Sequence, residues 1–122
     1  MNRMDALEFD LLVIGGGPAG SCAAATARQH VLRTLVVGKC AFPRFRLGES
    51  LLPAGNRVLR QIGVWPKIGA AGFVPKYGAE FHRSDGSGEK KATFSRGLIP
   101  GLDRAYQVER AKFDAVLLDH AR

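Results

Sequence analysis

The sequence contains few of the residues from which disulfide frameworks and metal sites are built. Its 122 residues include two cysteines, Cys22 and Cys40, and three histidines, and neither type occurs at a metal-ligand spacing. No apolar run approaches the roughly 20 residues that span a bilayer. Acidic residues precede the first apolar run, which is unlike a signal peptide. We therefore expect no metal site, no disulfide and no membrane span, and a cytoplasmic location.

Acidic residues are also scarce relative to basic ones. Eleven Asp and Glu face 18 Lys and Arg, so the formal net charge is +7. The basic residues form no single block and no aromatic-rich pattern accompanies them, so nucleic acid is not the expected partner. A dianionic small ligand explains a local excess of arginine equally well. The loose clusters are Arg44 with Arg46, Arg57 with Arg60, and Lys90 with Lys91.

What is present in the first third is a strand–turn–helix–strand pattern. Residues 9–14, "FDLLVI", form an apolar run of strand formers that ends in the glycine-rich "GGGPAG". Residues 21–30 are rich in alanine, which favours a helix. Residues 34–38, "TLVVG", read as a second buried strand. The spacing predicts a βαβ unit.

The remainder reads as a mixture of loop, helix and hairpin. The pattern predicts a loop over 40–50, a helix from Leu51 or Pro53 to Ile62 that ends at Gly63, and a short helix or turn over 64–73. It further predicts a β-hairpin from 76–84 and 90–96, a strand over 105–108 and a helix over 109–122. The apolar face of the first helix is expected to carry Leu52, Val58, Leu59 and Ile62. That of the last helix is expected to carry Phe113, Val116, Leu117 and either His120 or Ala121.

No strand follows the last predicted helix. In a doubly wound sheet a crossover helix feeds a further parallel strand. The pattern therefore predicts that the chain is a fragment of a longer enzyme, and that the first strand would expose unpaired edges.

The glycine turn has the spacing of a dinucleotide-binding fingerprint. Gly15-x-Gly17-x-x-Gly20 follows a predicted strand and opens a predicted helix. Gly15 permits the tight turn, Gly17 lets a pyrophosphate approach the backbone, and Gly20 lets helix and strand pack closely. The helix N-terminus offers free N–H groups to the phosphates. The alternative is a loop that merely turns the chain.

The residue at the tip of the second strand departs from the fingerprint. An Asp or Glu that binds the ribose hydroxyls is usual about 20 residues after the glycines, but this chain has Gly38, followed by Lys39. Losing a charged hydrogen bond weakens binding by roughly 1.5–3 kcal/mol. Either Gly38-Lys39 suits the 2′-phosphate of NADP, or the site has decayed.

Three stretches together carry a family resemblance. "GGGPAG", "FPRFRLGESLLP" and "YQVERAKFDAVLLDHA" resemble the flavin-dependent halogenases and their relatives in the superfamily of FAD-dependent monooxygenases and geranylgeranyl reductases. The resemblance implies an α/β fold with a Rossmann-like, glutathione-reductase-like FAD-binding βαβ unit and an added β-hairpin. Residues 1–122 would be the N-terminal part of an FAD-binding domain, whose remainder and whose substrate domain are absent.

The resemblance also implies residue roles toward FAD. The glycine turn would meet the pyrophosphate, the "RLGES" loop would lie along the flavin, and the segment before the last helix would touch FAD. Arg44 is expected to be solvated. The implied cofactor-binding residues are Gly15, Gly17, Ala19, Gly20, Arg46, Glu49, Ser50, Gln107 and Arg110.

Lys76 is the implied catalytic residue. "FVPKYGAEF" resembles the halogenase segment whose lysine faces the substrate. In that family reduced FAD, supplied by a flavin reductase, and O₂ oxidise a halide to hypohalous acid. The lysine holds that oxidant, by a hydrogen bond or as a chloramine, near an electron-rich aromatic substrate. From the residues alone, a plain surface lysine before a strand is the alternative.

The departures from the family leave three hypotheses. Gly38 replaces the family's Glu, the "WxWxIP" motif is absent, and Trp65 does not match it. The first hypothesis is an FAD-binding segment of a halogenase-like monooxygenase, inactive as an isolated chain. The second is a non-enzymatic remnant or binding module. The third is an NADP-preferring Rossmann domain, against which the loop "FPRFRLGES" argues.

Overall fold

The computed structural model describes residues 8–122, which divide into two compact units. The described part of the first unit comprises residues 8–46 and Ala111–Arg122, and the second comprises Leu47–Arg110. Within residues 8–122, no helix is long and apolar enough to cross a membrane. Each unit has its own strand pairing and its own buried side chains.

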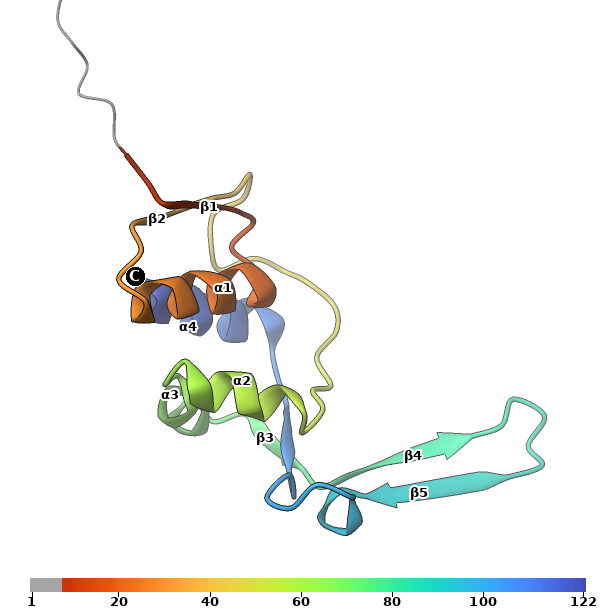
Figure 1. Ribbon diagram of the computed structural model, residues 1–122. Helices are drawn as coiled ribbons and strands as arrows, with labels where there is room; N and C mark the ends of the chain where they lie inside the picture. Colours follow the sequence, from red (N-terminus) through yellow and green to blue (C-terminus); the bar gives the residue numbers. More distant parts are fainter. Residues whose placement is uncertain (1–7) are drawn as a thin grey trace, which may run out of the picture. The chain divides into compact units, whose positions relative to one another are not determined.

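The first unit contains the predicted βαβ element. Strand β1 (Leu11–Ile14), helix α1 (Pro18–Gln29) and strand β2 (Thr34–Val37) follow one another, and β1 and β2 pair in parallel with Leu11 opposite Thr34 (Figure 1). Helix α1 begins three residues earlier than the alanine run predicts. Pro18 occupies its first turn, where a fixed φ suits the helix and no N–H is lost.

Small side chains form much of the buried face of this unit. Ala24, Ala25 and Ala27 on α1 are buried, and so are Phe113 and Leu117 on helix α4 (Arg110–Ala121). The predicted apolar stripe of α4 is thus confirmed at two of its positions. Two large and several small side chains give this unit a thin core.

The second unit consists of short elements. They are α2 (Gly55–Gln61), α3 (Trp65–Ala70), β3 (Val74–Lys76), β4 (Gly78–His82), β5 (Glu89–Thr93), a 3₁₀ turn (Phe94–Arg96) and β6 (Ala105–Gln107). Strands β4 and β5 form the predicted antiparallel hairpin, which appears in Figure 1 as a long two-stranded ribbon. Strand β3 pairs antiparallel with β6, a contact between residues about 30 positions apart that no sequence pattern indicated.

Helix α2 is shorter than predicted, and only part of its predicted apolar face is buried. Gly55 N–H bonds to Leu52 O and Asn56 N–H to Pro53 O, so the first turn closes through tighter i to i+3 bonds and is not α-helical. Leu52 and Val58, expected in the core, are 62% and 45% exposed. Leu59 and Ile62 are buried as predicted, and the polar Asn56 is buried beside them. Gly63 ends the helix as predicted, at φ +81°.

Candidate functional site

The glycine turn requires glycine at its first and last positions for different reasons. Gly15 adopts φ +108°, which side chains disfavour, and its N–H bonds to Val37 O at 2.7 Å. A Cβ on Gly20 would collide with the carbonyl oxygen of Gly15. The buried Ser21 hydroxyl donates to Gly16 O at 3.0 Å and fixes the turn against the helix. These contacts confirm the roles that the spacing predicts for Gly15 and Gly20.

The N-terminus of α1 is left open for an anion. Gly17 is the N-cap residue and supplies no side-chain cap, and the first turn contains no acidic residue. The first N–H groups of a helix have no intrahelical acceptor and carry the positive end of the dipole. With Ala19 exposed in this turn, the backbone can be approached closely, as a phosphate requires.

Arg44 lies against this turn. The prediction from the sequence that its side chain is solvated is wrong. Its side chain is 18% exposed, and its Nη2 lies 3.7 Å from an oxygen of the fully buried Asp114 on α4. Its guanidinium also lies 4.8 Å from the centre of the Phe42 ring. A Cβ built on Gly17 would lie 3.1 Å from the same Nη2. A buried carboxylate and an aromatic ring therefore hold the arginine over Gly17.

The guanidinium has more donors than the protein satisfies. Nη1 of Arg44 is buried and has no hydrogen-bond acceptor among the described residues. A buried donor without a partner is unfavourable, and an anion at the turn supplies the missing acceptors. The residues at this turn thus fit the pyrophosphate of a dinucleotide.

A cavity of about 140 Å³ lies beside the turn, at the tip of β2. Its lining includes Gly15, Gly38 and Cys40, together with Arg46 from the implied cofactor set. A Cβ on Gly38 would have Gly16 N as its nearest neighbour, at 3.8 Å, so the position tolerates a side chain. Among residues 8–122 no carboxylate lines this cavity, so within that range the acceptor that usually binds the ribose is missing here.

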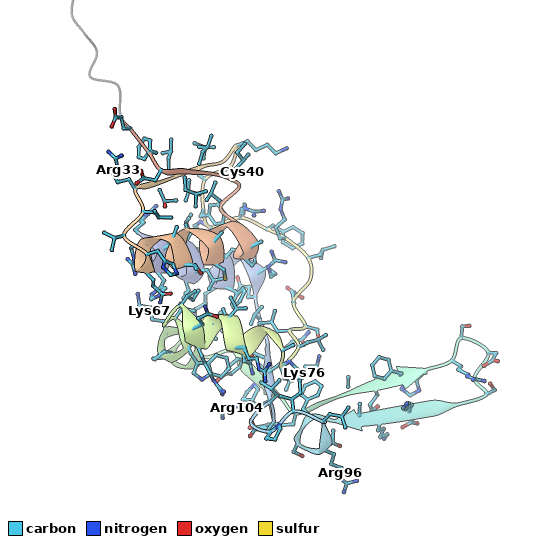
Figure 2. All side chains as sticks on the ribbon, in the orientation of Figure 1. Arg33, Cys40, Lys67, Lys76, Arg96 and Arg104 are labelled. Atoms are coloured by element: carbon cyan, nitrogen blue, oxygen red, sulfur yellow. The ribbon has the colours of Figure 1, made fainter. Side chains whose placement is uncertain are left out.

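In the second unit, Lys76 is held at the end of β3 by three neighbours. Its Nζ donates to Ser50 Oγ at 2.6 Å and to Leu51 O at 3.2 Å. The same Nζ lies 5.4 Å from the centre of the Phe94 ring. Figure 2 labels Lys76 beside the base of the β4–β5 hairpin. The half-buried lysine is therefore not a plain surface residue.

Strand β6 brings Ser50 and Lys76 to the same place. Ser50 forms an isolated antiparallel bridge with Gln107, and Gln107 also pairs with Val74 of β3. Leu51 N–H bonds to Tyr106 O, at 3.0 Å. The two segments therefore share β6 as a backbone template, which fixes the lysine opposite the serine.

The remaining implied cofactor residues of this unit support the same loop. Val108 N–H bonds to Glu49 O at 2.8 Å. Arg110 donates from Nη1 to Leu47 O at 2.7 Å. Gly48, at φ +92°, could not bear a side chain without approaching that guanidinium. The structure thus gives Arg110 a role in fastening the loop that contains Ser50.

The structure groups the implied residues by unit. Gly15, Gly17, Ala19, Gly20 and Arg46 belong to the first unit. Glu49, Ser50, Lys76, Gln107 and Arg110 belong to the second.

Sequence reasoning missed Asp114 and misjudged Arg44. A signal for Asp114 existed, because it lies three residues before Leu117 and so shares the buried face of α4.

In both units the described residues contain no group of His, Cys, Asp and Glu able to hold a metal ion, and the two cysteines are free.

A protein-family model decides the assignment. The model described as "Tryptophan halogenase" matches residues 10–98, which include the glycine turn, the "RLGES" loop and Lys76. The chain belongs to the tryptophan halogenase family. The family resemblance is thereby confirmed, and the first two of the three stretches lie within the matched range.

Curated relatives of this halogenase-family chain are flavin-dependent halogenases. It is 38% identical to the 1H-pyrrole-2-carbonyl-[peptidyl-carrier protein] chlorinase of Pseudomonas fluorescens, with 93% of this chain and 29% of the relative covered. It is 40% identical to the flavin-dependent halogenase armH3 of Armillaria mellea, with 94% and 22% covered. The chain therefore spans between a fifth and a third of the length of these relatives.

Solved structures support the same fold for the family member. The myxobacterial chondrochloren halogenase CndH, described as FAD-dependent, is 39% identical with a TM-score of 0.84, over 93% of this chain and 26% of that one. The flavin-dependent halogenase CmlS is 36% identical with a TM-score of 0.84, over 96% and 21%. The fold is the Rossmann-like, FAD-binding type, and FAD is the expected cofactor.

Proposed function

We propose that this chain binds FAD as a segment of a flavin-dependent halogenase-like monooxygenase. The observation that carries the proposal is Arg44, held over Gly17 by the buried Asp114 with a donor still unsatisfied. A buried ion pair at the mouth of a glycine turn suits a dianionic pyrophosphate. The open helix N-terminus supports the same ligand.

FAD, when bound in its reduced form, would donate electrons to O₂, and the resulting oxidant would take further electrons from a halide or a substrate. The chain's own part in that chemistry would be to bind and to orient. Gly17, Ala19 and Arg44 would hold the pyrophosphate, and Arg46 would lie beside it. Glu49, Ser50, Gln107 and Arg110 would form and support the loop along the flavin, and Lys76 would hold the oxidant near its target.

The finer partners follow from the family and are part of the proposal. We expect a small aromatic substrate, a halide and a separate flavin reductase. Carriage of the substrate on a carrier protein, as named for the chlorinase relative, is one form that such a substrate takes. As the chain covers 29% of that relative, we expect it to bind cofactor without turnover on its own. The non-enzymatic remnant remains the alternative.

One observation favours a second candidate cofactor. Gly38 and Lys39 both line the cavity beside the turn, where an uncharged corner and a lysine could accept a 2′-phosphate. A nicotinamide domain that prefers NADP would use this corner. The loop that fastens Ser50 to β6 has no role in such a domain, which is why FAD is preferred here.

A titration with FAD, read by flavin fluorescence, tests the proposal. Wild type is compared with Gly38→Glu and with Gly38→Gln, which has the same length and no charge, and each is also titrated with NADPH. Because a side chain fits at position 38, Gly38→Glu is expected to tighten FAD binding about tenfold, and Gly38→Gln clearly less.

Two outcomes would contradict the proposal. Tighter binding of NADPH than of FAD would favour the nicotinamide reading. Absence of FAD binding in all three proteins would mean that this segment is no cofactor-binding unit by itself.

Alkylation of the exposed Cys40, which lines the cavity, gives a second readout, because bound FAD should protect it. Cys22 is the internal reference, since burial raises the pKa of its thiol.

A further inference from the structure

The second unit contains a long stretch of sequence with basic residues and no acidic ones. Residues 50–79 include no aspartate or glutamate, and their basic residues are Arg57, Arg60, Lys67 and Lys76. Lys76 is held by the hydrogen bonds described above. The other three are exposed on helices α2 and α3, and neither the glycine turn nor the proposed oxidation uses them.

The three exposed basic residues lie on a small area of surface. Arg57 and Arg60 are three positions apart on α2, so they share one side of that helix. Lys67 lies on α3, which contacts α2, and is labelled beside the helix pair in Figure 2. Each helix is only about 10 Å long. We call Arg57, Arg60 and Lys67 the basic face.

The charges of the basic face are not neutralised locally. Among the described residues, no carboxylate lies within ion-pair distance of any of the three. In the β4–β5 hairpin, by contrast, Lys91 lies 3.2 Å from Glu80 and 2.9 Å from Glu89. Arg104, whose carbonyl oxygen is bonded to α2, follows directly after Asp103, and that pair adds no net charge. The helix pair therefore presents a positive surface.

Arg60 is held in place before any partner arrives. Its guanidinium carbon lies 4.9 Å from the centre of the Trp65 ring, and that ring packs against Tyr106 with the centres 5.5 Å apart. A guanidinium fixed on an aromatic ring loses little freedom when it binds a carboxylate. Arg, Trp and Tyr are also the residues that dominate binding at protein interfaces. Because Arg60 and Tyr106 already occupy the Trp65 ring, it is a poor stacking platform for a nucleic-acid base.

We propose that the basic face is a docking surface for a protein that presents a row of carboxylates. Val58, 45% exposed between the two arginines, adds the apolar contact that protein interfaces combine with charge. Helix α2 follows closely after Ser50, the neighbour of Lys76, so a docked protein could present a substrate near that lysine. This use rests on the proposed function, but the contact itself needs no FAD.

A helical peptide with a row of glutamates tests the inference on the intact chain. An alanine-rich peptide of about 20 residues is long enough to form a helix. It carries glutamates along one face, and the same peptide with glutamines is the reference. By fluorescence anisotropy, the glutamate peptide is expected to bind at least about tenfold more tightly at about 50 mM salt, and this preference should largely disappear at about 300 mM.

Two triple variants with the same loss of charge locate the binding. One replaces all three residues of the basic face by glutamine, and the control carries Arg83→Gln, Lys90→Gln and Lys91→Gln in the hairpin. The first is expected to lose about tenfold in affinity for the glutamate peptide, and the control less than about twofold. Both lower the net charge by three, so a difference between them reports position and not total charge.

Two further measurements guard against loss of folding. The double variant Arg57→Gln/Lys67→Gln keeps Arg60 on Trp65, and it should still lose about fivefold in affinity. In wild type, a carbodiimide couples carboxylates directly to nearby amines, and peptide mass spectrometry identifies the lysine. Lys67 should couple to the glutamate peptide several times more than Lys90, which is equally exposed.

The inference is overturned if the glutamate and glutamine peptides bind alike, if the two triple variants lose affinity equally, or if coupling favours Lys90. Heparin and vesicles of anionic lipid are tested as competing ligands. Binding of either that depends on the basic face, while peptide binding does not, would assign the surface to another partner. A failed FAD titration with peptide binding at the basic face would reject the proposed function and keep the inference, and the converse pair of results would do the opposite.

Discussion

The glycine turn of the first unit and the lysine corner of the second are built in opposite ways. The turn depends on side chains that are missing: Gly15 needs a positive φ, and Gly20 has no room for a Cβ. The corner, defined as Ser50, Leu51, Lys76 and Phe94, depends on side chains that are present and touch. We therefore expect additions to break the turn and deletions to break the corner.

The largest expected effect comes from adding one methyl group to the turn. Gly20→Ala drives a Cβ into the Gly15 carbonyl oxygen, so the turn must open, and unfolding in urea should show a loss of about 3 kcal/mol. The matched control is Gly55→Ala in the second unit, where a Cβ meets nothing within 4 Å. There alanine should be neutral or stabilise by up to about 1 kcal/mol. Equal losses in both variants would show that the turn is not the tight point.

A smaller effect is expected from the ion pair beside the turn. Asp114→Asn leaves the Arg44 guanidinium without its buried carboxylate, and a loss of about 2 kcal/mol is expected in urea unfolding. Asp119→Asn on the same helix is the control, since its pair with Arg122 is exposed, and a change below about 0.5 kcal/mol is expected. A similar effect in both variants would mean that Arg44 does not depend on Asp114.

The smallest effect compares one carboxylate from each unit. The Arg33 guanidinium and backbone N–H hold the pKa of Asp10 below its usual value, at the start of the β1–β2 pair. The Ser87 N–H and hydroxyl do the same for Asp85 in the β4–β5 turn. A lowered folded-state pKa means that the stabilisation is present above about pH 4 and disappears as pH falls through that folded-state value.

Asp10→Asn and Asp85→Asn should therefore differ from wild type at pH 5 and converge with it in stronger acid. The measurement is urea unfolding at several pH values between 5 and 2.5, with the exposed Asp103→Asn as reference. A difference that widens toward acid would have the wrong sign and would reject the assignment. Both carboxylates are exposed, so these effects should be the smallest of the series.

The same contrast explains what the sequence could predict. Glycine spacing between an apolar run and an alanine-rich helix predicts a turn, because the constraint is local and each residue acts through its own backbone. The βαβ unit, the hairpin and the last helix were predicted for the same reason. The predicted start of α2 was wrong, because the hydrogen bonds around Pro53 close a tighter turn than helix propensity implies.

The lysine corner and the Arg44–Asp114 ion pair could be predicted from the sequence only in part. Lys76 and Ser50 were identified by family resemblance, but their contact depends on the pairing of β3 with β6. Strands of three residues are too short to show the alternation of apolar and polar residues by which a strand is predicted. The burial of Arg44 depends on Asp114, about 70 positions away. Long-range partners of loop residues leave no periodic signal in one sequence.

The register of β6 sets where the chain can change in length. Side chains alternate along a strand, so one residue inserted among Ala105, Tyr106 and Gln107 would turn the residues on one side of the insertion to the opposite face and displace Ser50 relative to Lys76. The β4–β5 turn does not position either residue, and a Cβ built on its Gly86 would have no atom within 4 Å. We therefore expect homologues to vary in length at the hairpin tip and not at β6. Tags or reporters should likewise be tolerated at the hairpin tip, whereas an insertion in β6 should disrupt the structure.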